Sequence, residues 1–231
     1  MRHETAIQYG CDDAAIDTAI TLTRDTYIEY ARAIEPADTG EPVYWRIVFA
    51  LLTVHSPIHA SFAGYDALRA WRARYSRLPA NAAAIRRILE TTRADDGYGV
   101  LYAPTKARYI ADFSRAWVLD PTRFERNGDD DISWRYRVQA NVRGLGLAKA
   151  SFAVALCNAA ESNVCCIDTH IHALYTGSIA PRGGVRRAPY LAIEDTIRRK
   201  AAEHGLSTFV LQWLLWDAKR GTREAHSALT I

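Results

Sequence analysis

The sequence predicts an all-α fold, and two observations carry this prediction. Apolar residues recur at spacings of three and four along most of the chain, which is the period of an amphipathic helix. Strand-like alternation flanked by hairpin turns is not found. With 49% hydrophobic and 24% charged residues, the composition is that of a globular protein rather than a disordered chain. We therefore expect the 231 residues to form one large helical domain or two small ones packed together.

The predicted helices are bounded by residues that favour helix ends. Paired aspartates open the first helix, Pro42 starts the second, and the loop 126–131 ends in Asp131, which we expect to be an N-cap. The second helix is apolar on most sides, so we expect it to be central. In order, the expected helices cover 12–34, 43–55, a longer stretch from the Ser56–Pro57 break to Tyr75, 82–93, 105–119, 132–142, 189–204 and 207–220.

The charge of the chain permits a nucleic-acid partner without requiring one. The net charge is +3 and the isoelectric point is near 8.7. The lysines are Lys106, Lys149, Lys200 and Lys219, so lysine chemistry has few candidates. No run of about 18 apolar residues and no signal-like N-terminal stretch is found, and we expect an intracellular protein without a membrane role.

The cysteines predict neither a metal site nor an iron–sulfur cluster. Cys11, Cys157, Cys165 and Cys166 form no CxxC pair and no repeated ligand spacing. We expect reduced and mostly buried thiols.

The segment VRGLGLAKASFAVAL (142–156) predicts a helix end, a Gly-x-Gly hairpin and a new helix. Gly144 and Gly146 permit a tight turn, and the first N–H groups of the next helix have no partner within it. Such groups bind a phosphate oxygen without reading the base sequence. Taken alone, the pattern favours a plain turn between two helices.

A second segment, CCIDTHIHALYTG (165–177), delivers Asp168 to the start of another helix. On its own, Asp168 or Thr169 is explained as an N-cap. Together, the two segments resemble the helix-hairpin-helix DNA glycosylases with a Gly/Pro-rich loop and an essential aspartate (HhH-GPD). GLGLAKA is similar to the family's hairpin, and IDTHI is similar to its VDTH segment at the family's spacing.

The resemblance implies a two-lobed helical fold with DNA in the cleft between the lobes. Residues 40–163 would form one lobe, including the helix-hairpin-helix at about 131–162. Residues 1–39 and 164–231 would form the second lobe, which carries the aspartate loop. It also implies a monomer that acts on double-stranded DNA, Asp168 as the catalytic carboxylate, and no cofactor apart from a monovalent cation that such hairpins can hold through carbonyl groups.

The resemblance extends upstream of the hairpin. GVLYAPTKARYI (99–110) is similar to a helix entry of the family, and FALLTVHSPIHASF (49–62) is similar to the turn that inserts a side chain into the duplex. His55 is therefore the candidate for filling the gap left by a flipped base. Contacts with the DNA backbone are expected from Arg143, Gly144, Gly146, Ala148, Lys149, Lys106 and Arg108.

One position departs from the family's bifunctional members, in which a lysine two residues after the second glycine attacks the sugar. Here that residue is Ala148, and Lys149 follows with its side chain turned by about 100°. We therefore expect a monofunctional glycosylase. Since Lys149 lies at nearly the family's distance from Asp168, a shifted register would instead make it the nucleophile of a glycosylase that is also an abasic-site lyase.

The expected reaction gives C1′ oxocarbenium character as the base leaves, and an ionised Asp168 would stabilise it or activate a water. The flipped base needs a stacking pocket. Candidates are Tyr44, Trp45, Trp134, His170, Trp213 and Trp216, although aromatic residues at helical spacing usually belong to a core. His170 and His172 either assist protonation of the base or are structural.

Three other interpretations stay open. The chain is a DNA-binding module without activity, an enzyme of DNA base hypermodification on the same scaffold, or a helical protein-interaction domain, which full burial of Asp168 as a cap would favour. No cluster-binding C-terminal segment is recognisable, which separates the chain from endonuclease III-like members. The basic loop PRGGVRR (181–187) carries no assigned role.

Overall fold

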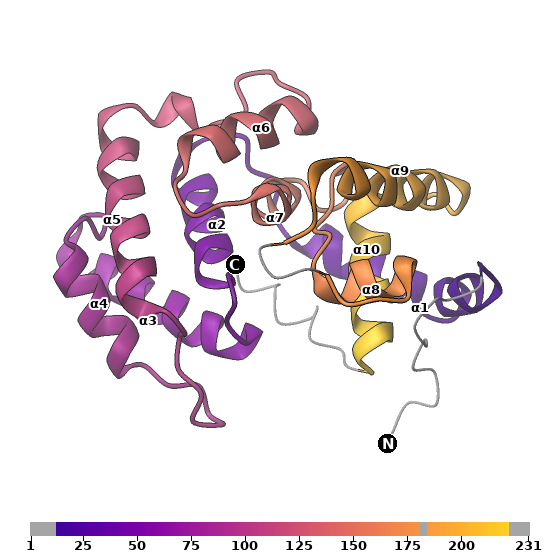
Figure 1. Ribbon diagram of the computed structural model, residues 1–231. Coiled ribbons are helices and arrows are strands. Elements are labelled where there is room, and N and C mark those ends of the chain that lie inside the picture. The colour runs from indigo at the N-terminus through magenta and orange to yellow at the C-terminus, as the bar shows by residue number, and fades with distance from the viewer. Residues whose placement is uncertain (1–12, 181–183, 222–231) are drawn as a thin grey trace. The chain divides into compact units, whose positions relative to one another are not determined.

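The computed structural model describes residues 13–180 and 184–221, and within them the fold is all-α, as the sequence predicts (Figure 1). An isolated bridge between Arg93 and Gly99 is the one extended pairing in these residues. No helix in the same ranges is long and apolar enough to cross a membrane.

The helices follow one another with short connections. They are α1 (Asp13–Ala33), α2 (Gly40–Leu52), α3 (Ile58–Tyr75), α4 (Ala82–Thr91), α5 (Ala103–Leu119), the 3₁₀ helix η1 (Pro121–Arg123), α6 (Asp131–Asn141), α7 (Leu147–Cys157), α8 (Thr169–Thr176), α9 (Arg187–Glu203) and α10 (Thr208–Arg220).

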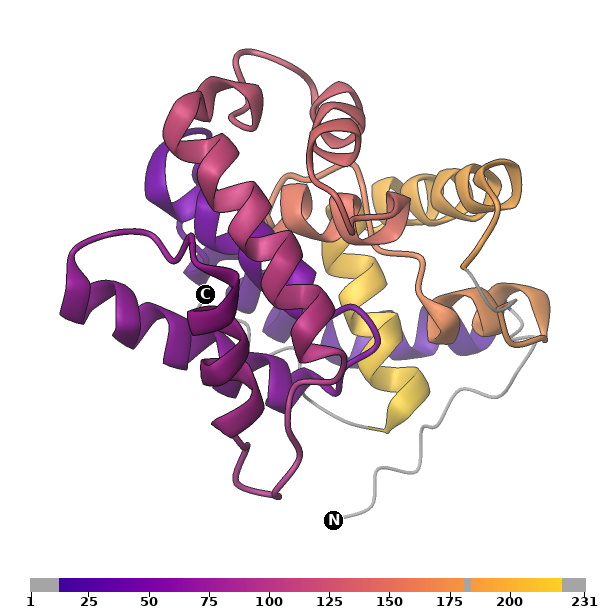
Figure 2. The same cartoon turned by 60° about the vertical axis from the view of Figure 1, so that its left-hand side comes forward.

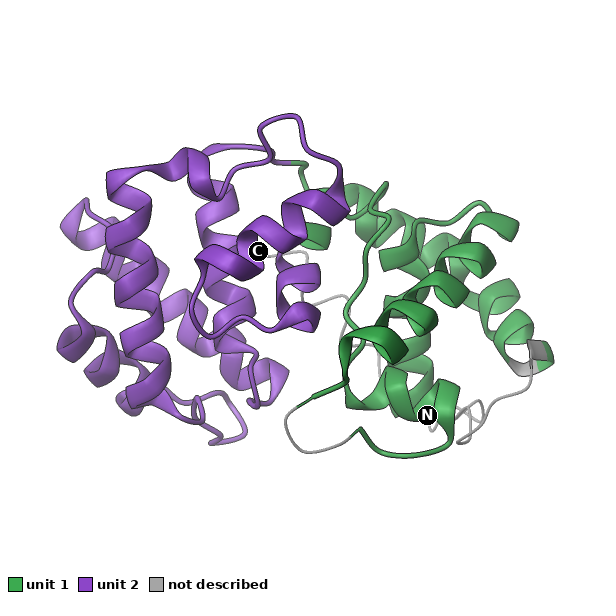
Figure 3. Ribbon diagram, turned by 45° about the horizontal axis from the view of Figure 1, so that its top comes forward, with its two compact units in different colours: residues 1–36, 154–231 green, residues 37–153 purple. Residues whose placement is uncertain are grey.

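The chain divides into two compact units (Figure 3). Unit 1 consists of residues 1–36 and 154–231, and unit 2 consists of residues 37–153. Unit 1 is therefore built from both ends of the sequence, and the boundary near residue 153 falls within α7.

The core of unit 2 is built around α2. Every residue from Val43 to Leu52 is buried, because this helix is apolar on most of its sides. It packs against α3 and α5, and α4 packs against both of these helices (Figure 1, Figure 2). The ring of Tyr44 stacks on Phe113 with centroids 5.1 Å apart. The prediction of a central second helix is confirmed.

The core of unit 1 is built around α10, which packs against α1, α8 and α9 (Figure 1). Its apolar residues between Phe209 and Leu215 are buried. The hydroxyl of Tyr27 on α1 donates a hydrogen bond of 2.8 Å to Asp217 Oδ2 on α10. This bond ties α1 to α10.

The capping prediction at the start of α6 is wrong by one residue. Asp130 is the N-cap, and its side chain accepts a hydrogen bond from the N–H of Ser133. Asp131 is instead the first helical residue, 3% exposed, and it pairs with Arg126 at 3.2 Å. Asp130 and Asp131 are the same residue type, and they differ in that Asp131 forms the ion pair with Arg126 while Asp130 caps the helix. Similarly, α2 begins at Gly40, with Pro42 in its first turn.

The cysteines that the structure describes are as expected. Cys157, Cys165 and Cys166 are buried thiols, and none of the three forms a disulfide. Cys11 and the first residues of the basic loop, 181–183, lie outside the described residues.

Candidate active site

Asp168 is the N-cap of α8 in unit 1. Its Oδ1 accepts hydrogen bonds from the backbone N–H groups of His170 at 2.9 Å and Ile171 at 3.0 Å. The backbone of Asp168 is extended, with φ −87° and ψ −171°, as an N-cap requires. The side chain is half-buried rather than enclosed. Asp168 therefore caps the helix and still reaches the surface of its unit.

The second carboxylate oxygen of Asp168 also has a partner. Oδ2 accepts a hydrogen bond of 2.8 Å from the indole Nε1–H of Trp216 on α10. Trp216 is half-buried. Three N–H donors from two helices thus bind one carboxylate.

The extended segment before Asp168 is held by buried side chains of α9 and α10. Glu194 Oε1 accepts from Cys165 N at 3.2 Å, and Gln212 Oε1 accepts from Cys166 N at 3.3 Å. The hydroxyl of Tyr190 donates to Cys165 O at 2.6 Å. A buried segment outside regular structure must satisfy its backbone groups in some such way. Hydrogen bonds from α9 and α10 to the segment before Asp168 therefore fix the position of this residue.

The two histidines after Asp168 differ in their surroundings. His170 is exposed, and the edge of its ring lies against Trp216 with centroids 6.4 Å apart. His172 is 8% exposed, and its Nδ1 lies 3.0 Å from Ser178 O and 3.2 Å from Thr176 Oγ1. His172 is a satisfied structural residue, while His170 stays close to the carboxylate.

The hairpin lies in unit 2, between α6 and α7. Gly144 has φ +96°, and a Cβ there would collide with the ring of Tyr109, so both conformation and space require glycine. The N–H groups of Gly146, Leu147 and Ala148 donate no hydrogen bond within the part of the chain that the structure describes. They form the unpaired N-terminus of α7 that the sequence predicts.

The cations of the hairpin lie against aromatic rings. The guanidinium of exposed Arg143 lies 5.5 Å from the ring centre of Tyr109. The Lys149 ammonium lies 5.2 Å from the ring centre of Phe152 and is half-buried. Ala150 is fully buried, and Ala148 is half-buried at the start of the helix.

Two loop tips of unit 2 carry exposed rings on strained backbone. His55 has φ +54° and Tyr102 has φ +56°, a region that side chains rarely occupy. Their ring centres are 6.1 Å apart, and Tyr102 is 65% exposed. Sequence reasoning selected His55 and missed Tyr102. The signal for Tyr102 was its place just before Ala103–Pro104, where α5 begins.

Lys106 is a buried amine rather than a surface cation. It is 3% exposed, and its Nζ donates to Leu52 O at 2.5 Å and to Ser56 Oγ at 2.6 Å. Burial, with a smaller contribution from the charge of Lys149, lowers the pKa of Lys106 to about 7. Lys106 therefore ties the end of α2 and the loop of His55 to α5, and it has little surface for a phosphate contact. The other predicted cation of this helix, Arg108, is exposed.

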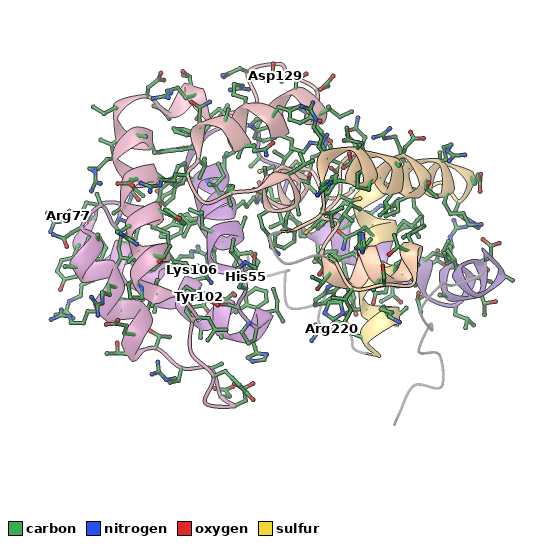
Figure 4. The ribbon with its side chains drawn as sticks, in the orientation of Figure 1. His55, Arg77, Tyr102, Lys106, Asp129 and Arg220 are labelled. Atoms are coloured by element: carbon green, nitrogen blue, oxygen red, sulfur yellow. The ribbon has the colours of Figure 1, made fainter. Side chains whose placement is uncertain are left out.

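A pocket of about 420 Å³ in unit 2 joins three segments that the sequence singled out. They are the turn with His55 and the entry to α5 with Tyr102 and Lys106, which Figure 4 labels, and the hairpin at Gly144. The lining residues are Leu51, Val54, His55, Tyr102, Thr105, Lys106, Tyr109 and Gly144.

Most of the aromatic candidates for a base pocket lie in the cores. Tyr44, Trp45, Trp134 and Trp213 are between 0% and 6% exposed. Trp134 Nε1 donates to Phe124 O, and Trp45 Nε1 donates to Glu41 Oε1. Trp216, with exposed His170 beside it, is the aromatic candidate with surface available. No group of three or more His, Cys, Asp and Glu side chains among the described residues has an arrangement for holding a metal ion.

The sequence matches no model of a known protein family and no curated protein. Solved structures give a clear result. An 8-oxoguanine DNA glycosylase of Methanocaldococcus jannaschii matches with a TM-score of 0.72 and 17% identity, over 90% of this chain and 95% of that chain. The chain has the fold of these glycosylases.

Two further structures agree. An 8-oxoguanine glycosylase/lyase of the same organism, in complex with DNA containing 8-oxoguanine, matches with a TM-score of 0.67 and 16% identity. The 8-oxoguanine DNA glycosylase of Thermotoga maritima matches with the same TM-score and identity. This chain covers 98% and 96% of these two chains. The glycosylase fold thus accounts for nearly the whole of each protein.

Proposed function

We propose that this chain is a DNA glycosylase that cleaves the bond between a flipped base and its sugar, assisted by Asp168. The observation that carries the proposal is the carboxylate of Asp168, half-buried and held by three N–H donors in a fold shared with 8-oxoguanine DNA glycosylases. As the base leaves, C1′ becomes positively charged, and a fixed anion stabilises that charge without reorganising.

The grip on DNA would come from unit 2. The unpaired N–H groups of Gly146, Leu147 and Ala148 suit a phosphate oxygen, and Arg143 and Lys149 add positive charge at the same hairpin. His55 and Tyr102 are exposed rings on fixed loop tips, which suits side chains that fill the space of an extruded base.

The substrate is proposed to be a damaged or modified base in double-stranded DNA. The similar structures include one with DNA that contains 8-oxoguanine, so 8-oxoguanine opposite cytosine is the first substrate to test. A base of DNA hypermodification is the second, because the scaffold and the role of Asp168 would be the same.

We propose hydrolysis of the base alone, without strand cleavage, because Ala148 occupies the position of the attacking lysine. The alternative is a glycosylase/lyase in which the Lys149 amine adds to C1′ and forms a Schiff base. One observation favours the alternative: the Lys149 side chain is half-buried at the hairpin, one residue after Ala148, rather than fully exposed to solvent.

The deciding experiment incubates the protein with duplexes that carry different lesions and modified bases, with and without alkali. We expect abasic sites that become strand breaks only after alkali. Asp168→Asn should lower the rate of base release roughly 100- to 1000-fold, the usual effect of removing transition-state charge stabilisation. Because Asn is as good an N-cap as Asp, α8 should be retained and DNA binding should persist.

Two controls separate the alternatives. Borohydride trapping of the wild type on DNA, lost in Lys149→Ala, would establish the lyase and refute hydrolysis alone. If no base is released from any duplex while DNA binding persists, the chain is a binding module and the glycosylase proposal is wrong.

A further inference from the structure

The carboxylate of Asp168 has more hydrogen-bond donors than a helix cap needs. A carboxylate offers about four acceptor positions, two on each oxygen. The N–H groups of His170 and Ile171 occupy the two positions of Oδ1 and complete the cap. The indole N–H of Trp216 takes one position on Oδ2. Among the described residues no other donor binds Oδ2, so a single position on it is left for another molecule.

Trp216 comes from a different helix, 48 residues further along the chain. It is itself held in place on α10. The guanidinium of Arg220, one turn later, lies 4.4 Å from its ring centre, and the ring of His170 meets it edge-on. An indole has one polar hydrogen, and here that hydrogen is directed at Asp168.

The bond from Trp216 adds a second hold on the orientation of the carboxylate. The two oxygens of Asp168 turn together about the Cβ–Cγ bond, a torsion that is broad in aspartate. The N–H groups of α8 act on Oδ1, and the indole N–H of α10 acts on Oδ2. The direction of the open acceptor position is therefore set by α8 and Trp216 together.

We propose that Trp216 is a positioning residue for the proposed reaction, whose indole N–H orients the Asp168 carboxylate so that one acceptor position on Oδ2 faces the reacting sugar or its attacking water. The inference rests on the proposed glycosylase function. It assigns to Trp216 a role that its ring alone does not perform, because a stacking role would need only the aromatic face.

Trp216→Phe separates the two roles, since Phe keeps an aromatic ring and loses the N–H. With excess enzyme, the rate of base release should fall roughly 10- to 100-fold, the range for losing a hydrogen bond to a charged group. Binding of the same duplex should change less than twofold.

The matched control is Trp117→Phe, the same substitution at a tryptophan that packs on Phe113 and Phe124 in the core of unit 2. It should lower stability and leave the rate of base release by the folded protein unchanged. The proposal is overturned if Trp216→Phe keeps the wild-type rate of base release, or if binding and rate fall by the same factor, which would make Trp216 a substrate-binding residue.

An activity-independent measurement tests the contact itself. In the wild type, the assigned indole N–H signal of Trp216 in a ¹H–¹⁵N NMR spectrum should lie downfield and move upfield in Asp168→Asn, in which an amide donor faces the indole. If the chemical shift of the Trp216 indole N–H is the same in the wild type and in Asp168→Asn, the proposal is overturned, even if Trp216→Phe does not fold. If the signal responds but the wild type releases no base, the proposed function fails and the bond is a helix-capping contact only, which also overturns the positioning role.

Discussion

Asp168 in unit 1 and Lys106 in unit 2 are charged residues that the protein holds in opposite ways. Asp168 is half-buried and receives three N–H donors, which replace the water that a carboxylate loses. Lys106 is 3% exposed, and burial, together with a smaller contribution from the charge of Lys149, lowers its pKa to about 7. Hydrogen bonds thus satisfy the carboxylate, whereas burial near a like charge lowers the pKa of the amine.

The comparison extends to the surroundings of each residue. Asp168 is placed by hydrogen bonds from α8, α9 and α10 to one extended segment. The pocket of Lys106 is shaped by close packing, above all where Tyr109 lies against the bare Cα of Gly144. We therefore expect unit 2 to be most sensitive to added volume and unit 1 to lost hydrogen bonds.

The largest effect is expected for Gly144→Ala. The new methyl group would collide with Tyr109, and the backbone would keep a strained φ of +96°. Strain and overpacking together should lower the free energy of unfolding by roughly 2–5 kcal/mol, measured by urea denaturation. The matched control is Gly128→Ala, at φ +79° with open space around its Cβ, which should cost only about 1–2 kcal/mol. Equal costs at the two glycines would show that packing against Tyr109 is unimportant.

The second largest effect concerns how the free energy of unfolding depends on pH. We expect Lys106 to contribute to this dependence and Lys106→Met to remove that contribution. The folded pKa of about 7 lies below the unfolded value of 10.5, so between these values the unfolded chain binds more protons. Stability of the wild type relative to the variant should therefore rise with pH across this window, by about 1.4 kcal/mol per unit at most, and level off below pH 7. From pH 7.5 to 9.5 the gain should be roughly 2–3 kcal/mol.

The measurement is urea denaturation of both proteins at half-unit steps of pH. It should stop below pH 10, because burial raises the pKa of Tyr44 and its titration in the unfolded chain would intrude. Lys149→Gln is the control, since removal of its charge should move the onset of the rise to higher pH. A difference between wild type and Lys106→Met that stays constant with pH would contradict the lowered pKa.

The sequence predicts the local features of the site well. Helix periods, the Gly-x-Gly turn and an aspartate before a helix are set by residues within a few positions of one another, and all of them are found. The choice between Asp130 and Asp131 as a cap could not be predicted, because it depends on the ion pair with Arg126.

Contacts between distant segments had no signal in the sequence. The bond between Trp216 and Asp168 spans 48 residues, and the bond between Lys106 and Leu52 spans 54. A lysine among apolar residues on a helix is usually a surface residue, so the burial of Lys106 was not predicted. Tyr102 was missed for the same reason, since its position beside His55 depends on how two loops meet.

The smallest effect is expected for Tyr190→Phe, which tests the hydrogen bonds that hold the extended segment before Asp168. The variant loses the hydroxyl that donates to Cys165 O at 2.6 Å and accepts from Ile167 N at 3.4 Å. Stability should fall by about 1–2 kcal/mol, because a buried carbonyl loses a partner. Base release should slow less than in Trp216→Phe, since the bonds from Glu194 and Gln212 remain.

Ser114→Ala is the control for Tyr190→Phe, because it removes a buried hydroxyl bond of 2.7 Å to Tyr44 in the other unit. It should lower stability by a similar amount and leave base release unchanged. A slower reaction in Tyr190→Phe but not in Ser114→Ala would show that hydrogen bonds set the position of Asp168, whereas equal rates in both variants would mean that the cap and Trp216 suffice. In that second case, the sensitivity of unit 1 to lost hydrogen bonds would be limited to the Asp168 carboxylate and its three N–H donors.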